Sequence, residues 1–208
     1  MIFTLPRLVT ACEDYLLSQE LDIACQNITK TLARYLRSAV FVKDTIPDEI
    51  NGRHTAYERY KGLTVLAHHH PKPVASKPHD HGCTWAIYGV AAAKTAMYEW
   101  ELVEPAKDGQ RGKVKLKRSY WIMPGMAFYF PRGVIHSHQT YDDSKLIRIE
   151  GMNIRSNHFR VGGNYFDPIS TGVIQHGDLG GQPQTPNACQ WHGDFDTPSG
   201  DAARPLLR

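Results

Sequence analysis

Apolar side chains follow a helical period over the first forty residues of the chain. They recur at spacings of mostly three and four in two runs, residues 5–16 and 21–36. This period predicts two amphipathic helices, each with one apolar stripe along its length. Thr4 is placed to cap the first helix, and Asp22 lies where the second one begins. Both stripes must pack against another part of the protein to be stable.

From about residue 54 the pattern changes to short apolar runs that are separated by glycine, proline and aspartate. These runs predict eight strands, at residues 56–61, 63–69, 85–90, 95–103, 113–122, 127–130, 136–140 and 145–150. Short strands at this spacing are typical of a β-sandwich or a β-barrel. The sequence therefore predicts a mainly β protein whose barrel follows two N-terminal α-helices.

The domain organisation follows from the same pattern. After Gly162 the sequence becomes rich in glycine, proline, aspartate, asparagine and glutamine, which predicts an irregular tail. We expect a helical segment packed on the barrel over residues 1–50, the barrel over 51–161 and the tail over 162–208. A chain of 208 residues has the length of one domain with an appendage, so these parts form one domain.

Composition and charge exclude several classes of protein. The chain has 24 Lys and Arg against 21 Asp and Glu, and this excess of +3 is too small to indicate a surface for nucleic acid or membranes. No apolar run approaches the ~20 residues of a membrane-spanning helix, and the first residues do not form a secretory signal. The four cysteines form no Cys-x-x-Cys pair, which favours a reduced, cytoplasmic protein. The unusual feature is the count of eleven histidines.

Two of these histidines, His79 and His81, stand in the sequence Pro-His-Asp-His-Gly. In an extended segment alternate residues share a face, so both imidazoles would project to the same side. Two imidazoles on one side can bind a single metal ion. Such a pair also occurs by chance on protein surfaces, so it does not establish a metal site by itself.

A second motif supplies a third histidine. The residues from Gly125 to His136 have the form Gly-x5-Pro-x-Gly-x2-His, with Pro131 and Gly133 at the fixed positions. We expect Gly125 to turn the chain into a strand, and Pro131 and Gly133 to bend it out again. His136 then begins the next strand and points inward. His138 shares the face of His136, so it is either the alternative third ligand or a residue that contacts the ligands.

Together the two motifs resemble those of the cupin superfamily, whose fold is a double-stranded β-helix, a small jelly-roll barrel. The second motif matches the cupin pattern except at its end, where Thr140 replaces the usual asparagine. The first motif lacks the usual glutamate, because Trp85 or Ala86 stands at its position. The resemblance therefore implies a metal site made of the histidines of the two motifs alone.

A three-histidine cupin site resembles that of the thiol dioxygenases, the family of cysteine dioxygenase and 3-mercaptopropionate dioxygenase. The two N-terminal helices, and the order of an arginine, two strands and Pro-His-Asp-His, are similar to that family. The resemblance implies that His79, His81 and His136 hold the metal. It also implies that Arg53 and Trp85 contact the substrate.

The chain departs from that family on a late strand. Where thiol dioxygenases carry alternating serine, histidine and tyrosine beside the metal, this sequence has Leu146, Arg148 and Glu150. If these residues face the barrel, both charged groups are candidate catalytic residues: Arg148 can hold a substrate carboxylate and Glu150 can relay a proton. In the alternative, the isoleucines between them face the core and the charges face solvent. Alternation alone does not decide between these two arrangements. Arg59 remains the alternative to Arg53 as the arginine that contacts the substrate.

Three neutral imidazoles leave a divalent cation its full charge and open positions for a substrate and O2. The sequence thus predicts a mononuclear non-haem dioxygenase that uses Fe(II), with Zn, Ni or Mn as other candidate metals, and a small anionic substrate such as a thiol. Two alternatives remain open. One is a cupin dioxygenase that cleaves a C–C bond in a diketone-like substrate, and the other is a cupin isomerase or metal-binding protein. No nucleic-acid or membrane partner is expected, and a homodimer remains open.

Overall fold

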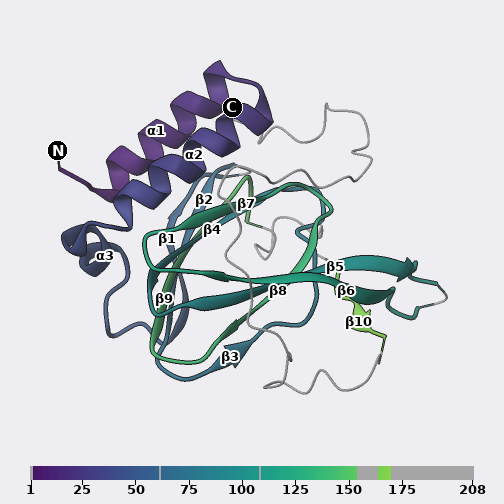
Figure 1. The fold of residues 1–208 in the computed structure, drawn as a ribbon. Coiled ribbons are helices and arrows are strands. Elements are labelled where there is room, and N and C mark those ends of the chain that lie inside the picture. Colours follow the sequence, from purple (N-terminus) through teal and green to yellow (C-terminus); the bar gives the residue numbers. More distant parts are fainter. Residues whose placement is uncertain (1, 61, 108, 154–163, 170–208) are drawn as a thin grey trace.

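Three helices precede two facing β-sheets in the chain (Figure 1). The computed structural model describes residues 2–60, 62–107, 109–153 and 164–169. The helices are α1 (Leu5–Ser18), α2 (Leu21–Tyr35) and α3 (Ala39–Thr45). The two predicted helices are confirmed, whereas α3 was not predicted because seven residues carry too little periodicity. Ser38 begins this helix by accepting a hydrogen bond from the backbone N–H of Phe41.

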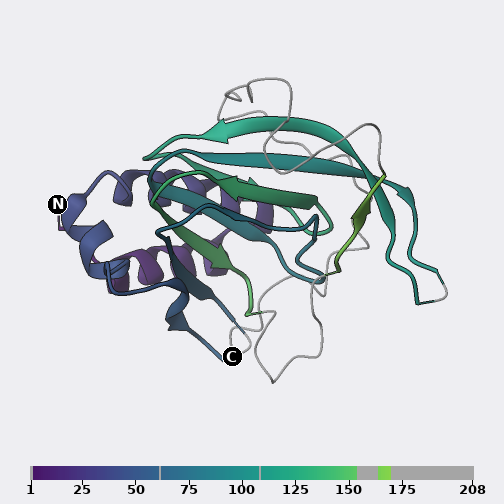
Figure 2. The ribbon, with the colours of Figure 1, turned by 90° about the horizontal axis from the view of Figure 1, so that it is seen from below.

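The strands form two five-stranded sheets that face each other as a double-stranded β-helix, the predicted fold (Figures 1 and 2). Across the first sheet the order is β1 (Gly52–Glu58), β2 (Thr64–His70), β9 (Ser144–Glu150), β4 (Ala86–Ala92) and β7 (Ala127–Phe130). Across the second sheet it is β10 (Asp167–Pro168), β6 (Lys113–Ile122), β5 (Thr95–Glu104), β8 (Ile135–Thr140) and β3 (Val74–Ala75). All neighbours are antiparallel except β10 and β6.

Eight of these strands correspond to the predicted ones, and the differences have simple causes. The strands β3 and β10 have two residues each and are too short to leave a pattern in the sequence. The strand β1 lies earlier than the predicted range 56–61, because it is a partly exposed edge strand with polar residues at its start. Such a strand lacks the apolar signal on which the prediction depends.

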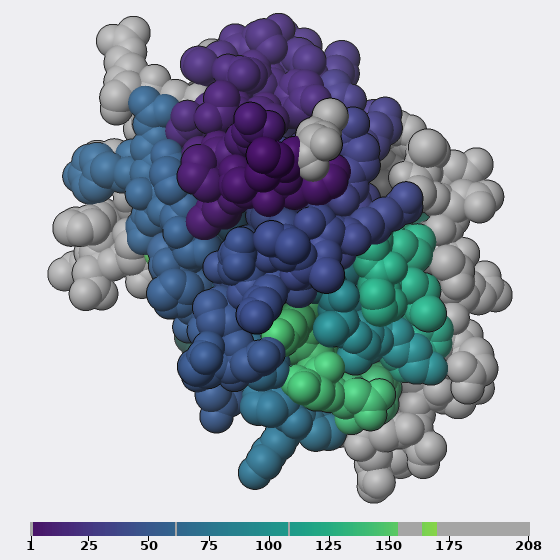
Figure 3. Space-filling model, turned by 90° about the vertical axis from the view of Figure 1, so that its left-hand side faces the viewer, coloured from purple at the N-terminus to yellow at the C-terminus, as the bar shows by residue number. Residues whose placement is uncertain are grey.

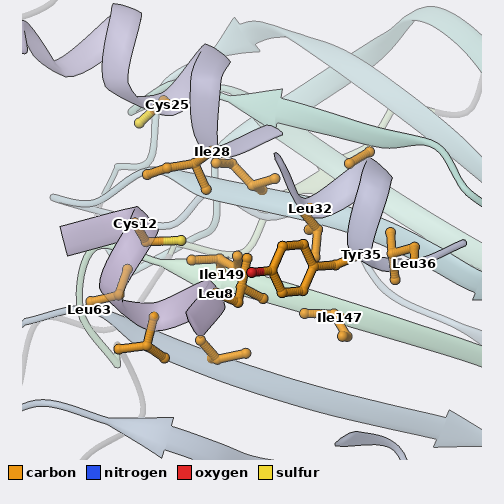
Figure 4. Close-up of a cluster of buried hydrophobic side chains, with 14 of the residues drawn as sticks. Leu8, Cys12, Cys25, Ile28, Leu32, Tyr35, Leu36, Leu63, Ile147 and Ile149 are labelled. Carbon is orange, nitrogen blue, oxygen red and sulfur yellow. The ribbon is translucent and has the colours of Figure 1, made fainter. Parts of the chain in front are cut away.

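The helices α1 and α2 cover the outer face of the first sheet, as Figures 1 and 3 show. Leu8 of α1 and Ile28 and Leu32 of α2 pack with Ile147 and Ile149 of β9 in one buried cluster (Figure 4). The apolar stripes predicted for the two helices are thus buried against the barrel. In the part of the chain that the structure describes, no helix is both long enough and apolar enough to cross a membrane.

The strand β9 is buried on both of its faces. Ile147 and Ile149 face the helices, whereas Leu146 packs in a second cluster inside the barrel. Arg148 and Glu150 share the face of Leu146, and their side chains are 8% and 0% exposed. The isoleucines face a core, as in the alternative arrangement, but the charged side chains do not face solvent. The reason is that helices cover one side of this sheet and the second sheet covers the other.

Candidate metal centre

Three histidines converge at one place inside the barrel. His79 and His81 come from the segment before β4, and His136 lies on β8. One ring nitrogen of each lies within 4.8 Å of the others, and the Nε2 atoms of His81 and His136 are 3.2 Å apart. Among the described residues, no other group of three or more histidine, cysteine or acidic side chains is arranged in this way. The structure therefore brings together the three predicted ligands.

Nδ1 of each of the three rings lies next to an oxygen atom. Nδ1 of His79 is 2.8 Å from the carbonyl oxygen of Lys77, and Nδ1 of His136 is 3.0 Å from that of Val134. Nδ1 of His81 is 3.0 Å from Oε1 of Glu150. Carbonyl oxygens only accept, so Nδ1 carries the proton in His79 and His136. The Nε2 lone pairs of these two rings are thus left for a metal ion, as in imidazole ligands that a neighbouring oxygen orients.

Burial keeps His79 and His136 in the form that binds a metal. It lowers the pKa of His79 from its usual value, and lowers that of His136 well below it. The neighbouring rings of the cluster lower the pKa of His136 further, because a positive charge on one ring opposes a charge on the next. A neutral imidazole has the free lone pair that coordination requires.

Backbone contacts hold the two motifs next to each other. His79 and His136 exchange two hydrogen bonds of 2.9 Å, in which the N–H of each donates to the carbonyl of the other. Gly82 turns the chain directly after His81 with a φ of 58°, and Gly133 turns it before β8 with a φ of 77°. Both values lie in the left-handed region that favours glycine. The turn predicted at Gly133 is therefore confirmed.

Asp80, between the two histidines of the first motif, anchors its segment. Its Oδ1 accepts hydrogen bonds from the backbone N–H of Gly82 at 2.9 Å and from that of Asn164 at 2.8 Å. The side-chain amide of Asn164 also donates to both carboxylate oxygens, and the N–H of Phe166 donates to the carbonyl of Pro78. Residues expected to belong to an irregular tail therefore fix the metal-binding segment and form β10.

A buried ion pair borders the histidines. Nε of Arg148 lies 2.8 Å from Oε1 of Glu150, the same oxygen that approaches His81. Burial opposes the charge on Arg148, but the carboxylate of Glu150 raises its pKa above the usual value. The barrel thus holds a permanent cation beside the histidines, and Glu150 connects that cation to one of the ligands.

Tyr88 also lies in this cluster, and sequence analysis missed it. Its hydroxyl is 3.2 Å from Nε2 of His81 and 3.4 Å from Nε2 of His136, and it accepts a hydrogen bond of 3.2 Å from Nη1 of Arg148. Tyr88 stands in the run Ala-Ile-Tyr-Gly-Val, where a tyrosine looks like any core aromatic. Only the register that pairs Tyr88 of β4 with Arg148 of β9 places it at the site.

The two residues implied as substrate contacts lie outside this cluster. Trp85 is fully buried among the side chains between the first sheet and the helices. It shares the face of Ile87, so the strand pleat turns it away from Tyr88. Its contact with the substrate remains a prediction. Arg53 is exposed on the edge strand β1, opposite His68. Its role in substrate binding remains a prediction.

His138, the rival third ligand, lies beside the cluster. Its Nδ1 is 3.1 Å from Oγ of Ser76, and burial lowers its pKa to about 3. Its ring centroid is 6.1 Å from that of Tyr88. Of the two histidines on β8, His136 is therefore the one that completes the metal-binding group.

Comparisons with known proteins give weak likenesses to barrel structures. No family model and no curated protein matches this chain. KdgF from Halomonas sp. is 19% identical with a TM-score of 0.37, over 51% of this chain and 82% of that one. The DMSP lyase DddQ from Ruegeria pomeroyi DSS-3 is 15% identical with a TM-score of 0.35, over 49% of this chain and 46% of that one. An uncharacterized conserved protein with a double-stranded beta-helix domain from Klebsiella pneumoniae subsp. pneumoniae MGH 78578 is 10% identical, with a TM-score of 0.41, over 63% and 93%.

None of these likenesses assigns a substrate or a reaction to this chain. The strand order and the histidine cluster define a cupin-fold barrel whose three imidazoles can hold a metal ion. Nitrogen donors of this kind fit a first-row transition metal such as iron, zinc or nickel. The identity of the metal does not follow from the donor set, because the order of affinities among these metals does not favour iron.

Proposed function

We propose that this protein is a mononuclear non-haem iron dioxygenase that acts on a small anionic substrate, with a thiol as the first candidate. The observation that supports this proposal most is the convergence of three imidazoles beside a buried guanidinium. The three imidazoles add no charge to a bound Fe(II), which would supply adjacent open positions for the substrate and O2.

The side chains around the histidines bind and orient the substrate in this proposal. Arg148 points into the barrel and attracts the anionic group of the substrate, in the role expected from the sequence. Glu150 touches Arg148 and His81, so it holds the guanidinium and the imidazole in place. The surrounding barrel residues exclude water from the reacting groups.

The metal site is tested by elemental analysis of the purified wild-type protein and of His79→Ala and His136→Ala. We expect about one iron per chain in the wild type and its loss in both variants. His54→Ala, which changes an exposed histidine of β1, should keep its iron. A full complement of zinc or nickel in the wild type would support the three histidines as ligands, but it would count against a function as an oxygenase. Protein that binds no metal even after loading would contradict the proposal.

A second candidate function is the cleavage of a C–C bond in a diketone-like substrate. It is favoured by Leu146, Arg148 and Glu150, which stand where thiol dioxygenases carry serine, histidine and tyrosine. Oxygen uptake by the iron-loaded protein, measured with cysteine and 3-mercaptopropionate against β-dicarbonyl compounds, separates the two. Metal binding without oxygen uptake from any of these compounds would instead indicate an isomerase or a binding protein.

A further inference from the structure

The hydroxyl of Tyr88 lies among the atoms that would hold the metal. Tyr88 is on β4 with its ring inside the barrel, and the residue is 2% exposed. Its oxygen, Nε2 of His81 and Nε2 of His136 form a triangle with sides of 3.2, 3.4 and 3.2 Å. Two of these three atoms belong to the histidine cluster.

These separations match the spacing of atoms that share one metal ion. Ligand atoms that each lie about 2.0–2.1 Å from an ion, at angles between roughly 90° and 109°, are themselves roughly 2.8–3.4 Å apart. All three sides of the triangle fall in this interval. The phenol oxygen is therefore spaced from His81 and His136 as a further ligand of one ion would be.

The hydroxyl lies at hydrogen-bond distance from both Nε2 atoms and beside the guanidinium of Arg148. Arg148 only donates, so the phenol oxygen accepts from it at 3.2 Å. A phenol proton directed at Nε2 of His81 or His136 would compete with a metal ion for that lone pair. A phenolate oxygen instead offers lone pairs to the ion, and the guanidinium of Arg148 stabilises its negative charge.

We propose that Tyr88 is a fourth ligand, whose phenolate oxygen binds the same metal ion as His79, His81 and His136. This inference rests on the proposed function, because it requires the three-histidine metal site. A phenolate ligand lowers the net charge of the metal centre by one and fills one coordination position. Fewer positions then remain for substrate and O2, so Arg148 becomes the main source of positive charge for an anionic substrate.

The experiment uses the colour of a phenolate bound to ferric iron. The full-length protein is loaded with Fe(II) under anaerobic conditions, freed of excess metal and oxidised to Fe(III) with ferricyanide. We expect a phenolate-to-iron charge-transfer band in the visible spectrum of the wild type, with tyrosinate ring modes in the resonance Raman spectrum. Tyr88→Phe should lose both signals and bind iron at least about tenfold more weakly.

Matched variants make the result specific. Tyr120→Phe removes a hydroxyl from another tyrosine in the barrel cluster and should keep the band. Fluorotyrosine at position 88 keeps the shape of the side chain and should shift the band, which covers the case in which Tyr88→Phe does not fold. Wild-type protein with one ferric ion per chain and no such band would overturn the inference, as would a band that survives in Tyr88→Phe. Wild-type protein that binds no iron would overturn the metal site itself, and the inference with it.

Discussion

Glu150 determines how the charges inside the barrel are balanced. A single oxygen, Oε1, lies 2.8 Å from Nε of Arg148 and 3.0 Å from Nδ1 of His81. The side chain is 0% exposed, so water does not compensate for a missing partner. Removing one member of a buried ion pair is strongly destabilising, because the other charge is left without compensation.

We therefore predict that Glu150→Gln weakens both the fold and the metal site. The change should lower the free energy of unfolding by about 3–5 kcal/mol, since Arg148 stays charged and buried. It should also lower metal affinity by roughly 10- to 100-fold, because His81 loses the carboxylate that orients it. Denaturant titration and competition with a chelator measure the two effects.

Two further variants separate the two roles of Glu150. Adding Arg148→Met to Glu150→Gln removes the unpaired charge, so it should restore most of the stability but not the metal affinity. Glu101→Gln breaks an exposed ion pair between Glu101 of β5 and Lys115 of β6, and it should change neither measurement appreciably. A Glu150→Gln variant as stable as the wild type would contradict the importance of this pair.

At the scale of the elements, the sequence predicts the strands and the candidate ligand histidines well. It does not predict which face of a strand points into the barrel. His79, His81 and His136 could be predicted because fixed glycines and prolines surround them in two short motifs. Tyr88 could not, because β4 is apolar on both faces and its register with β9 depends on residues far along the chain. For Arg148 the same limit applies, since alternation does not say whether one face or both faces of a sheet are buried.

The close packing of α2 on β4 can be tested at Gly89. A Cβ atom built at this position would lie 2.5 Å from Cδ1 of Leu36 and 2.8 Å from Cδ2 of Leu32. Both leucines are buried in the cluster beneath the helices and cannot move without displacing their neighbours. We expect Gly89→Ala to lower the free energy of unfolding by about 1–3 kcal/mol, measured by chemical denaturation.

Gly62→Ala is the matched control for this prediction. A Cβ atom at Gly62 would meet only ordinary contacts with the side chain of Arg59, at 3.4 Å or more. The control should therefore change the free energy of unfolding by no more than about 0.5 kcal/mol. Equal stability of the two variants would mean that the helices are not held as closely to the first sheet as the structure shows.

For the molecule as a whole, the candidate metal centre connects parts that are distant in the sequence. His136 belongs to the second sheet, whereas Tyr88 and Glu150, which contact the ligands, belong to the first. The segment that carries His79 and His81 is in turn fixed by Asn164 through Asp80. An ion bound here therefore joins the two sheets, and its binding free energy adds to the stability of the fold.

We accordingly predict that metal binding raises the melting temperature and that this rise depends on His136. An ion at 100 times its dissociation constant stabilises the folded state by about 2.7 kcal/mol. In a chain of 208 residues this corresponds to a rise of roughly 5–10 °C. Thermal unfolding of the metal-free protein with and without Zn(II), which suits imidazole ligands and does not oxidise, measures the rise. His136→Ala should show none, and Mg(II), which prefers oxygen ligands, should have no effect on either protein. If Zn(II) raised the melting temperature of His136→Ala as much as that of the wild type, the ion would bind elsewhere and the two sheets would not be joined through it.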